Sequence, residues 1–306
     1  MYQKHGAYYL VKHNRWTNLG KNLPAALAEY ARRITASSGL SELIDEFLKD
    51  SRRTVKSNTL RQYEQAARTV QAAFIEFAPD QVCPEHIWKF LQHHRSTPNM
   101  ANRMRSVLKM VFDRAVLAGQ CATNPVTSVP RFSEKKRDRY ISDDEYTRLI
   151  EVASPTLRVI INMAYLTGQR IGDVLKIKQS DISLDGITVV QEKTGKKLKV
   201  AMTPTLEENI RAARRLHGRI TPTYLLGQRN GKIRKYKGVR DLLQRYVDKA
   251  GLDDIHLHDF RAKAITDAKK QGYDPQALAG HTTEAQTVRY LRDKEIPLVY
   301  GPRFKQ

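Results

Sequence analysis

Short groups of basic, histidine and tyrosine residues in the second half of the chain have the types and spacing for chemistry on a phosphate. Arg170 comes two residues after Gly168, which is predicted to end one helix, and Arg170 begins another short helix. An arginine beside a helix N-terminus lies at a favoured anion site, and its planar fork suits bidentate phosphate binding. His258 and Arg261 are three residues apart, so on a helix they share a face and could donate to two phosphate oxygens.

Three further residues extend this set. Lys193 precedes Thr194-Gly195 at the predicted tip of a β-hairpin, from where a lysine can reach into a groove. His281 follows a predicted helix end at Gly280, and Tyr290 lies nine residues after His281. Taken singly, the segments that contain His281 and Tyr290 are more typical of a plain helix end or a core position than of a functional site.

The sequence lacks the usual signs of metal-dependent phosphoryl transfer. Two-metal sites need clustered carboxylates, whereas Asp143-Asp144 and Asp253-Asp254 fall at predicted helix starts or turns, where aspartate is an ordinary cap. His256 and His258 could be two metal ligands, but no third ligand lies near them in the sequence. We therefore expect no metal site and no cofactor, and chemistry that relies on cations and hydrogen-bond donors.

The composition favours a polyanionic partner. The chain of 306 residues carries a formal net charge of +21, which indicates nucleic acid first and an anionic membrane surface second. Cys83 and Cys121 are its only cysteines, which excludes a disulfide framework and a cysteine-rich zinc site. The chain has no apolar run of about 18 residues, and its first residues do not resemble a secretory signal, so we expect a cytoplasmic protein without a membrane span.

The elements that must position the candidate residues are mainly helical. Apolar residues recur at helical spacing in four segments within residues 40–118, which predicts a small helical bundle. After residue 140, a capping box at Ser142 and Glu145 opens a series of helices, interrupted by the hairpin around Thr194-Gly195. The expected fold class is mainly α with a small β-sheet.

Changes in sequence pattern divide the chain into four parts. Residues 1–39 have the content of a strand followed by a helix and form a small basic appendage, which either binds DNA or extends the bundle. Residues 40–130 form the helical domain. The nearly all-charged segment 131–139 is expected to be an exposed interdomain linker rather than a loop within one domain. Residues 140–306 form the second domain with a C-terminal tail.

A second basic segment precedes the helix predicted near residues 238–250. It contains no acidic residue between positions 229 and 237, and we expect it to follow a DNA backbone, although an ordinary solvated loop is the alternative. Its candidate DNA-binding residues are Arg229, Lys232, Arg234, Lys235 and Lys237.

Taken as an ordered set, the candidate residues resemble those of the tyrosine recombinases, the phage integrase family of DNA breaking and rejoining enzymes. In that family an arginine follows Thr-Gly-x, a lysine lies on a β-hairpin, a His-x-x-Arg and a Leu-Gly-His follow, and a tyrosine comes nine residues later. The resemblance covers about residues 40–291 and implies a helical core-binding domain and a mixed α/β catalytic domain. The matching residues are Arg170, Lys193, His258, Arg261, His281 and Tyr290.

The resemblance implies a role for each matching residue. Tyr290 attacks the scissile phosphate and forms a covalent 3′-phosphotyrosine, and His258 can accept its proton. Lys193 is the general acid for the departing 5′ oxygen. Arg170 and Arg261 neutralise the charge that develops in the transition state.

Other residues support this assignment or compete with it. His281 donates a further hydrogen bond, although Ala279 stands where the family usually has leucine. Asp173 has the place of an acidic residue that supports the site. Tyr300 is the main alternative to Tyr290 as the nucleophile. Three more lysines on the hairpin compete with Lys193 for its role: Lys196, Lys197 and Lys199.

The function that the resemblance implies is site-specific DNA recombination, with phage or prophage integration as the commonest role in the family. The implied partners are double-stranded DNA, three further copies of the chain in a tetramer on DNA, and a host DNA-bending protein or an excisionase. A type IB topoisomerase-like enzyme, a non-catalytic DNA-binding protein and a basic RNA-binding module are the alternatives.

Overall fold

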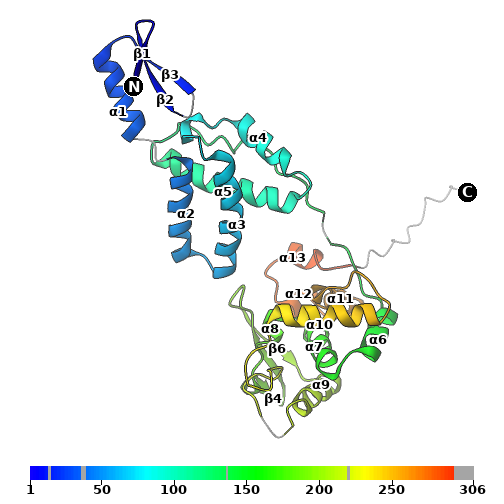
Figure 1. Ribbon diagram of the computed structural model, residues 1–306. Coiled ribbons are helices and arrows are strands. Elements are labelled where there is room, and N and C mark those ends of the chain that lie inside the picture. The colour runs from blue at the N-terminus through cyan, green and yellow to red at the C-terminus, as the bar shows by residue number, and fades with distance from the viewer. Residues whose placement is uncertain (13–14, 36–38, 136, 219–220, 293–306) are drawn as a thin grey trace, which may run out of the picture. The chain divides into compact units, whose positions relative to one another are not determined.

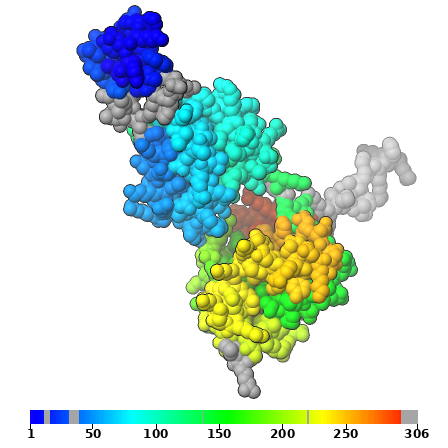
Figure 2. Space-filling view, in the orientation of Figure 1, coloured from blue at the N-terminus to red at the C-terminus, as the bar shows by residue number. Residues whose placement is uncertain are grey.

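The chain forms two compact units, which consist of residues 1–136 and 137–306. Figure 1 shows the helices and strands of both units, and Figure 2 shows their surfaces. The division falls inside the segment 131–139 that the sequence marks as a linker. The structure is a computed structural model, and it describes residues 1–12, 15–35, 39–135, 137–218 and 221–292.

The first unit begins with a three-stranded antiparallel sheet and a helix, where the sequence predicts one strand and a helix. The first two of the three strands are joined by a two-residue hairpin turn, in which His5 and Gly6 both adopt positive φ. Ala7, Leu19 and Ala26 are buried where the helix meets the sheet. The elements are β1 (Tyr2–Lys4), β2 (Ala7–Lys12), β3 (Arg15–Gly20) and α1 (Leu23–Thr35).

Four longer helices form the bundle that the apolar spacing predicts. The predicted stripe from Leu40 to Phe47 is buried, and Leu48 is half-buried at its margin. The longest helix contributes Met104, Leu108 and Val111 to the same core. The elements are α2 (Leu40–Thr54), α3 (Ser57–Phe74), the short 3₁₀ turn η1 (Pro79–Gln81), α4 (Pro84–His93) and α5 (Pro98–Leu117).

The second unit consists of helices around a small antiparallel sheet, whose strands pair in the order β4-β5-β6. The predicted capping box is confirmed, because Ser142 Oγ accepts from the Glu145 amide at 3.2 Å and Glu145 accepts from the Ser142 amide. The elements are α6 (Asp143–Val152), α7 (Pro155–Thr167), α8 (Ile171–Val174), η2 (Gln179–Asp181), β4 (Ile182–Ser183), β5 (Gly186–Val190), β6 (Lys197–Ala201), α9 (Pro204–Arg215), α10 (Tyr236–Lys249), α11 (Leu257–Lys270), α12 (Pro275–Ala279) and α13 (Glu284–Val288).

Helix α11 lies at the centre of the second unit. Apart from His258, all its residues from Leu257 to Ala268 are buried, and the helix packs against α7 and α12. Lys263 is buried among the rings of three tyrosines and forms an ion pair with Asp267 at 3.1 Å. Since a buried charge has to be paired, this network fixes the position of α11.

The end of the predicted linker belongs to the second unit. Arg137 Nη2 lies 2.6 Å from Asp259 Oδ2, and Arg137 Nη1 lies 2.7 Å from Asp254 Oδ1. Asp259 in turn accepts from the His256 amide, so the pair holds the first turn of α11. Arg139 pairs with Glu145 in the capping box. Arg137 and Arg139 are therefore half-buried, whereas the sequence predicts an exposed segment.

Candidate active site

Arg170 is placed by a turn that requires glycine. Helix α7 ends at Gly168 with a φ of +63°, and a Cβ atom there would lie 2.8 Å from Leu278 Cγ. Two residues later, Arg170 caps the N-terminus of α8. Its Nη1 atom donates to Gln191 Oε1 at 3.2 Å and lies 4.0 Å from Asp173 Oδ2. The guanidinium therefore keeps donors for an anion.

Arg261 is almost completely buried, with 1% of its surface exposed. Its Nη1 atom donates to the Gly168 carbonyl at 2.8 Å, and its Nη2 atom donates to the Ala279 carbonyl at 2.9 Å. Burial and the charge of Arg170 lower the pKa of Arg261. Two neighbouring cations repel each other, so this part of the site favours an anion between them.

His281 lies beside Arg261 in a defined tautomer. Arg261 Nη2 lies 3.1 Å from His281 Nε2, and because arginine can only donate, Nε2 is the acceptor. The proton then lies on Nδ1, which donates to Thr287 Oγ1 at 3.1 Å. Desolvation and the nearby arginines lower the pKa of His281 to about 4. The imidazole is therefore neutral in the DNA-free protein near pH 7.

Tyr290 is in contact with the three residues that surround it. The centre of its ring lies 4.9 Å from that of His281 and 5.2 Å from that of His258. The Arg261 guanidinium carbon lies 5.2 Å from the centre of the same ring. The Tyr290 amide donates to the Thr287 carbonyl at 2.8 Å, so the turn that holds the His281 ring also holds the tyrosine.

His258 occupies the first turn of α11, one helical turn before Arg261, as the spacing predicts. Its side chain reaches solvent on one side and packs against Tyr290 on the other. Desolvation and the Arg261 cation lower the pKa of His258 to about 4, against an opposing effect of Asp259. A neutral imidazole at this place can accept a proton.

Lys193 lies in the loop between the two long strands of the hairpin, and its side chain is exposed. The sequence predicts that the first strand extends to Lys193, but β5 ends at Val190. The loop closes by a hydrogen bond from the Gly195 amide to the Gln191 carbonyl at 2.8 Å. His258, His281 and Arg261 contact Tyr290, whereas Lys193 is carried by the exposed hairpin loop.

Asp173 is buried between Arg170 and the start of the hairpin loop. Its Oδ1 atom accepts from the Glu192 amide at 3.0 Å, and its Oδ2 atom faces Arg170. Within the described residues, Oδ2 has no hydrogen-bond partner. The carboxylate thus links the arginine to the loop that carries Lys193.

Two buried residues of the site are not among the sequence candidates. Gln191 joins Arg170 to the hairpin, and Thr287 fixes the His281 ring. Neither residue titrates, and neither forms a recognisable motif, so only the contacts identify them. Tyr300, the alternative nucleophile, lies outside the described residues.

The candidate DNA-binding residues near the start of α10 consist of one half-buried arginine and four exposed cations. Arg234 is half-buried, and its Nε atom donates to the Leu226 carbonyl at 3.0 Å. The other four candidate DNA-binding residues are exposed: Arg229, Lys232, Lys235 and Lys237.

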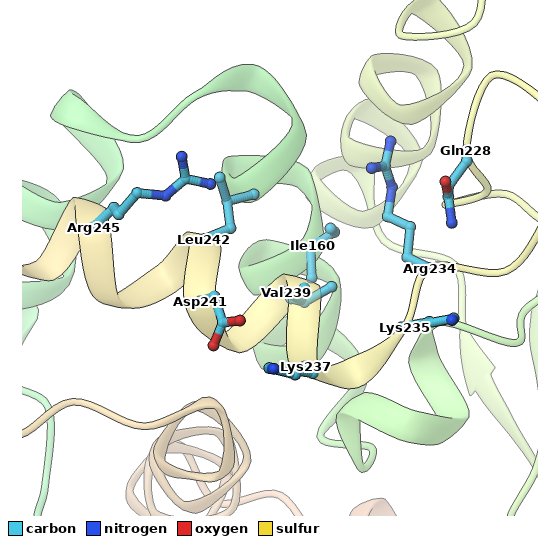
Figure 3. Close-up of a pocket in the computed structure, with 10 residues that line it drawn as sticks. Ile160, Gln228, Arg234, Lys235, Lys237, Val239, Asp241, Leu242 and Arg245 are labelled. Atoms are coloured by element: carbon cyan, nitrogen blue, oxygen red, sulfur yellow. The ribbon is translucent and has the colours of Figure 1, made fainter.

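A pocket of about 490 Å³ lies where this segment meets α10. In Figure 3, Arg234 and Arg245 stand at opposite ends of the pocket, with Ile160, Val239 and Leu242 between them. Lys235, Lys237 and Asp241 complete its margin, and α10 together with the segment before it contributes to the yellow area in Figure 2. Cations around a depression on an exposed surface suit contacts with phosphates.

We expect both site histidines to titrate below pH 5 in the DNA-free protein. Their pKa values of about 4 lie below the ordinary 6.5, because desolvation and, to a smaller extent, the buried arginine disfavour the protonated form. Nitrogen-15 NMR of the imidazoles, assigned with His258→Gln and His281→Gln variants, measures the midpoints. A bound phosphate raises both values, and a midpoint near 6.5 without DNA would contradict this electrostatic picture.

The same shifts have a consequence for stability. Between pH 6.5 and pH 4 the unfolded chain binds protons at these positions that the folded chain does not bind. The free energy of unfolding therefore decreases as the pH falls through this interval. Urea unfolding at a series of pH values measures the slope, which is shallower when either histidine is replaced.

Among the described residues, no group of three or more His, Cys, Asp or Glu side chains is arranged to hold a metal ion. In the same part of the chain, every helix is too short or too polar to cross a membrane.

Two family models match the chain. The model of the phage integrase family matches residues 139–295, and that of the phage integrase central domain matches residues 40–131. The prophage integrase IntE of Escherichia coli K12 is 30% identical over 220 residues, which are 64% of this chain and 58% of that protein. The integrase of Escherichia phage HK022 is 29% identical over 51% of this chain and 45% of that protein. The chain thus spans about half the length of these two relatives.

Solved structures confirm the predicted fold class. A lambda integrase dimer bound to a COC′ core site matches with a TM-score of 0.78 and 21% identity, over 99% of this chain and 97% of that chain. A lambda integrase tetramer bound to a Holliday junction matches with a TM-score of 0.75 and 21% identity, over 93% and 95%.

Proposed function

Since this chain belongs to the phage integrase family of tyrosine recombinases, we propose that it is a site-specific recombinase that cuts and rejoins duplex DNA, in the role of a phage or prophage integrase. The observation that carries the proposal is the packing of Tyr290 against His258, His281 and Arg261. A phenol that contacts a guanidinium and two imidazoles is suited to attack a phosphate.

The cleavage step follows from these contacts. The Tyr290 phenolic oxygen attacks the scissile phosphorus, its proton passes to the neutral imidazole of His258, and the bond from phosphorus to the 5′ oxygen breaks. Lys193 gives a proton to the departing 5′ oxygen. The product is a 3′-phosphotyrosine and a free 5′ hydroxyl, and the reverse reaction rejoins the strand without another energy source.

Charge stabilisation comes from the two arginines. Arg170 and Arg261 carry the positive charge into a partly desolvated site, where donors aimed at a developing anion have their largest effect. His281 presents an unprotonated Nε2 atom in the DNA-free protein, so it becomes a donor only after it takes up a proton. The phosphate raises the pKa of His281 and thereby completes the site.

The assembly proposed for this activity is a tetramer of the chain on double-stranded DNA, in the cytoplasm. The net charge of +21 supports the DNA partner. The exposed cations before α10 contact the DNA backbone. The basic appendage of residues 1–39 either binds a separate DNA segment or extends the helical bundle. A host DNA-bending protein or an excisionase is the further partner of such an assembly.

A nicked suicide substrate tests the proposal. Duplexes with a randomised central segment and a nick beside it lose the short leaving strand after cleavage, so the covalent complex accumulates. We expect the protein to retain DNA through denaturing electrophoresis, and sequencing of that DNA gives the recombination site. Tight binding without any covalent complex would favour a non-catalytic DNA-binding protein. Relaxation of supercoiled DNA without a site preference would favour a topoisomerase-like enzyme.

We expect cleavage to persist in EDTA. The proposed step uses two guanidinium groups, a lysine and two imidazoles to neutralise charge and move protons, and no carboxylate takes part in it directly. The measurement is the amount of covalent complex with EDTA and with magnesium, with DNA binding recorded in both buffers. A complete loss of cleavage in EDTA that magnesium restores, with binding unchanged, would contradict this chemistry.

A further inference from the structure

Gln191 lies at the base of the hairpin loop, with its side chain fully buried and fully hydrogen-bonded. Its Nε2 atom donates to Gln169 Oε1 and to the Ala279 carbonyl, both at 2.8 Å. Its Oε1 atom accepts from Arg170 Nη1 at 3.2 Å and from Thr194 Oγ1 at 3.0 Å. Because all four hydrogen bonds are satisfied, the amide has one orientation, and rotating it would place donors against donors.

These four hydrogen bonds join parts of the proposed site that are far apart in the sequence. Thr194 directly follows Lys193, so Gln191 holds the loop from which that lysine projects. The Ala279 carbonyl also accepts a hydrogen bond from Arg261. The Gln191 amide and the second arginine therefore share one acceptor. Gln191 therefore connects the loop to both arginines.

The surroundings of Gln191 leave no room for displacement. A Cβ atom at Gly280, where φ is +66°, would lie 2.6 Å from Gln191 Nε2. Gln169 is also fully buried, and its Nε2 atom donates to the Leu278 carbonyl at 2.6 Å. The two glutamines thus tie the hairpin to the end of α12, immediately before His281.

Arg170 depends on this amide for its orientation. The Asp173 carboxylate stays 4.0 Å from Arg170 Nη1, so Gln191 Oε1 supplies the direct hydrogen bond. A neutral acceptor orients the guanidinium without adding a second negative charge beside that of Asp173, which leaves positive charge for a phosphate. A carboxylate in the same place would compete with the DNA.

We propose that Gln191 is a positioning residue that couples the loop carrying Lys193 to Arg170, so that the general acid and the phosphate-binding arginine are brought into place together. The proposal rests on the proposed recombinase function. It predicts that changes at Gln191 or Thr194 act on the cleavage rate through Arg170 and leave DNA affinity nearly unchanged.

One variant is Gln191→Met, which keeps the length and removes every hydrogen bond of the amide. The other is Thr194→Val, which removes the hydrogen bond from the loop to the amide and the longer one, 3.4 Å, that the hydroxyl accepts from the Lys196 amide. Thr188→Val, on the same hairpin outside this network, is the matched control. Single-turnover formation of the covalent complex is measured with saturating suicide DNA of the selected sequence. We expect cleavage to be about tenfold slower for Gln191→Met, because the lost hydrogen bond with Arg170 contributes roughly that factor to the rate. We expect less slowing for Thr194→Val and none for the control.

A double-mutant cycle separates positioning from general loss of structure. In an Arg170→Ala background, followed long enough to record its slow rate, both changes should slow cleavage less than they do in the wild type, because the part of their effect that acts through Arg170 is absent. Equal slowing in both backgrounds, or wild-type rates for both single variants, would overturn the proposal. If Gln191→Met fails to fold, the cycle with the exposed Thr194 decides the question. Failure of the recombinase function itself is distinct, because the wild type then forms no covalent complex.

Discussion

Replacement of Tyr290 by phenylalanine abolishes the covalent complex and leaves DNA affinity within about twofold of the wild type. The phenolic oxygen is the nucleophile, and most of the affinity for DNA comes from phosphate contacts elsewhere. The ring packs against His258 and His281, and phenylalanine preserves that packing. Denaturing electrophoresis with the suicide substrate and a gel-shift titration measure the two quantities.

Tyr300→Phe is the matched control for this experiment. Tyr300 lies outside the described residues, ten positions after Tyr290. We expect the Tyr300→Phe variant to form the covalent complex at the wild-type rate. A Tyr290→Phe protein that still forms the complex, together with a Tyr300→Phe protein that does not, would reverse the assignment.

Replacement of Arg261 by alanine lowers the cleavage rate by at least about 10²–10³-fold, the usual effect of losing one donor to a developing oxyanion. The change also leaves the Gly168 and Ala279 carbonyls without this donor, so the variant is less stable. Arg170→Ala should slow cleavage by a similar factor with a smaller loss of stability, because Arg170 is half-buried and not fully buried.

Single-turnover cleavage and urea unfolding on the same preparations distinguish the two effects. Arg211→Ala is a suitable control, since Arg211 is an exposed arginine on α9 that lies 3.8 Å from Glu207. We expect wild-type cleavage from this control. A rate within a few fold of the wild type for Arg261→Ala or Arg170→Ala would remove that arginine from the proposed site.

Residues whose roles depend on local spacing could be predicted from the sequence. His258 and Arg261 are three positions apart on α11, and both pack against Tyr290 as a shared helix face requires. Gly168 and Gly280 end their helices with positive φ, as glycine at those positions indicates. The helical bundle followed from apolar periodicity for the same reason, since the pattern lies within each segment.

Features that depend on contacts between distant segments could not be predicted. The Gln191 amide donates hydrogen bonds to residues that lie 22 and 88 positions away in the sequence. No sequence motif of glutamine predicts such partners. The sequence predicts one strand near the N-terminus where the structure has three, in part because a His-Gly turn is a weak hairpin signal. The sequence predicts a strand up to Lys193 because the turn signal Thr194-Gly195 comes only after that residue, whereas strand pairing ends at Val190.

The ion pair between Arg137 and Asp259 decides where the second unit can be separated from the first. Asp259 is 1% exposed, and a buried carboxylate without its arginine is strongly destabilising. A recombinant fragment that begins at residue 140, where the helical pattern starts, loses this arginine, and the first turn of α11 with His258 loses its anchor. A fragment for biochemistry therefore has to include Arg137. A protease that cuts before Arg137 leaves the ion pair in the second unit, whereas one that cuts after it yields a less stable product.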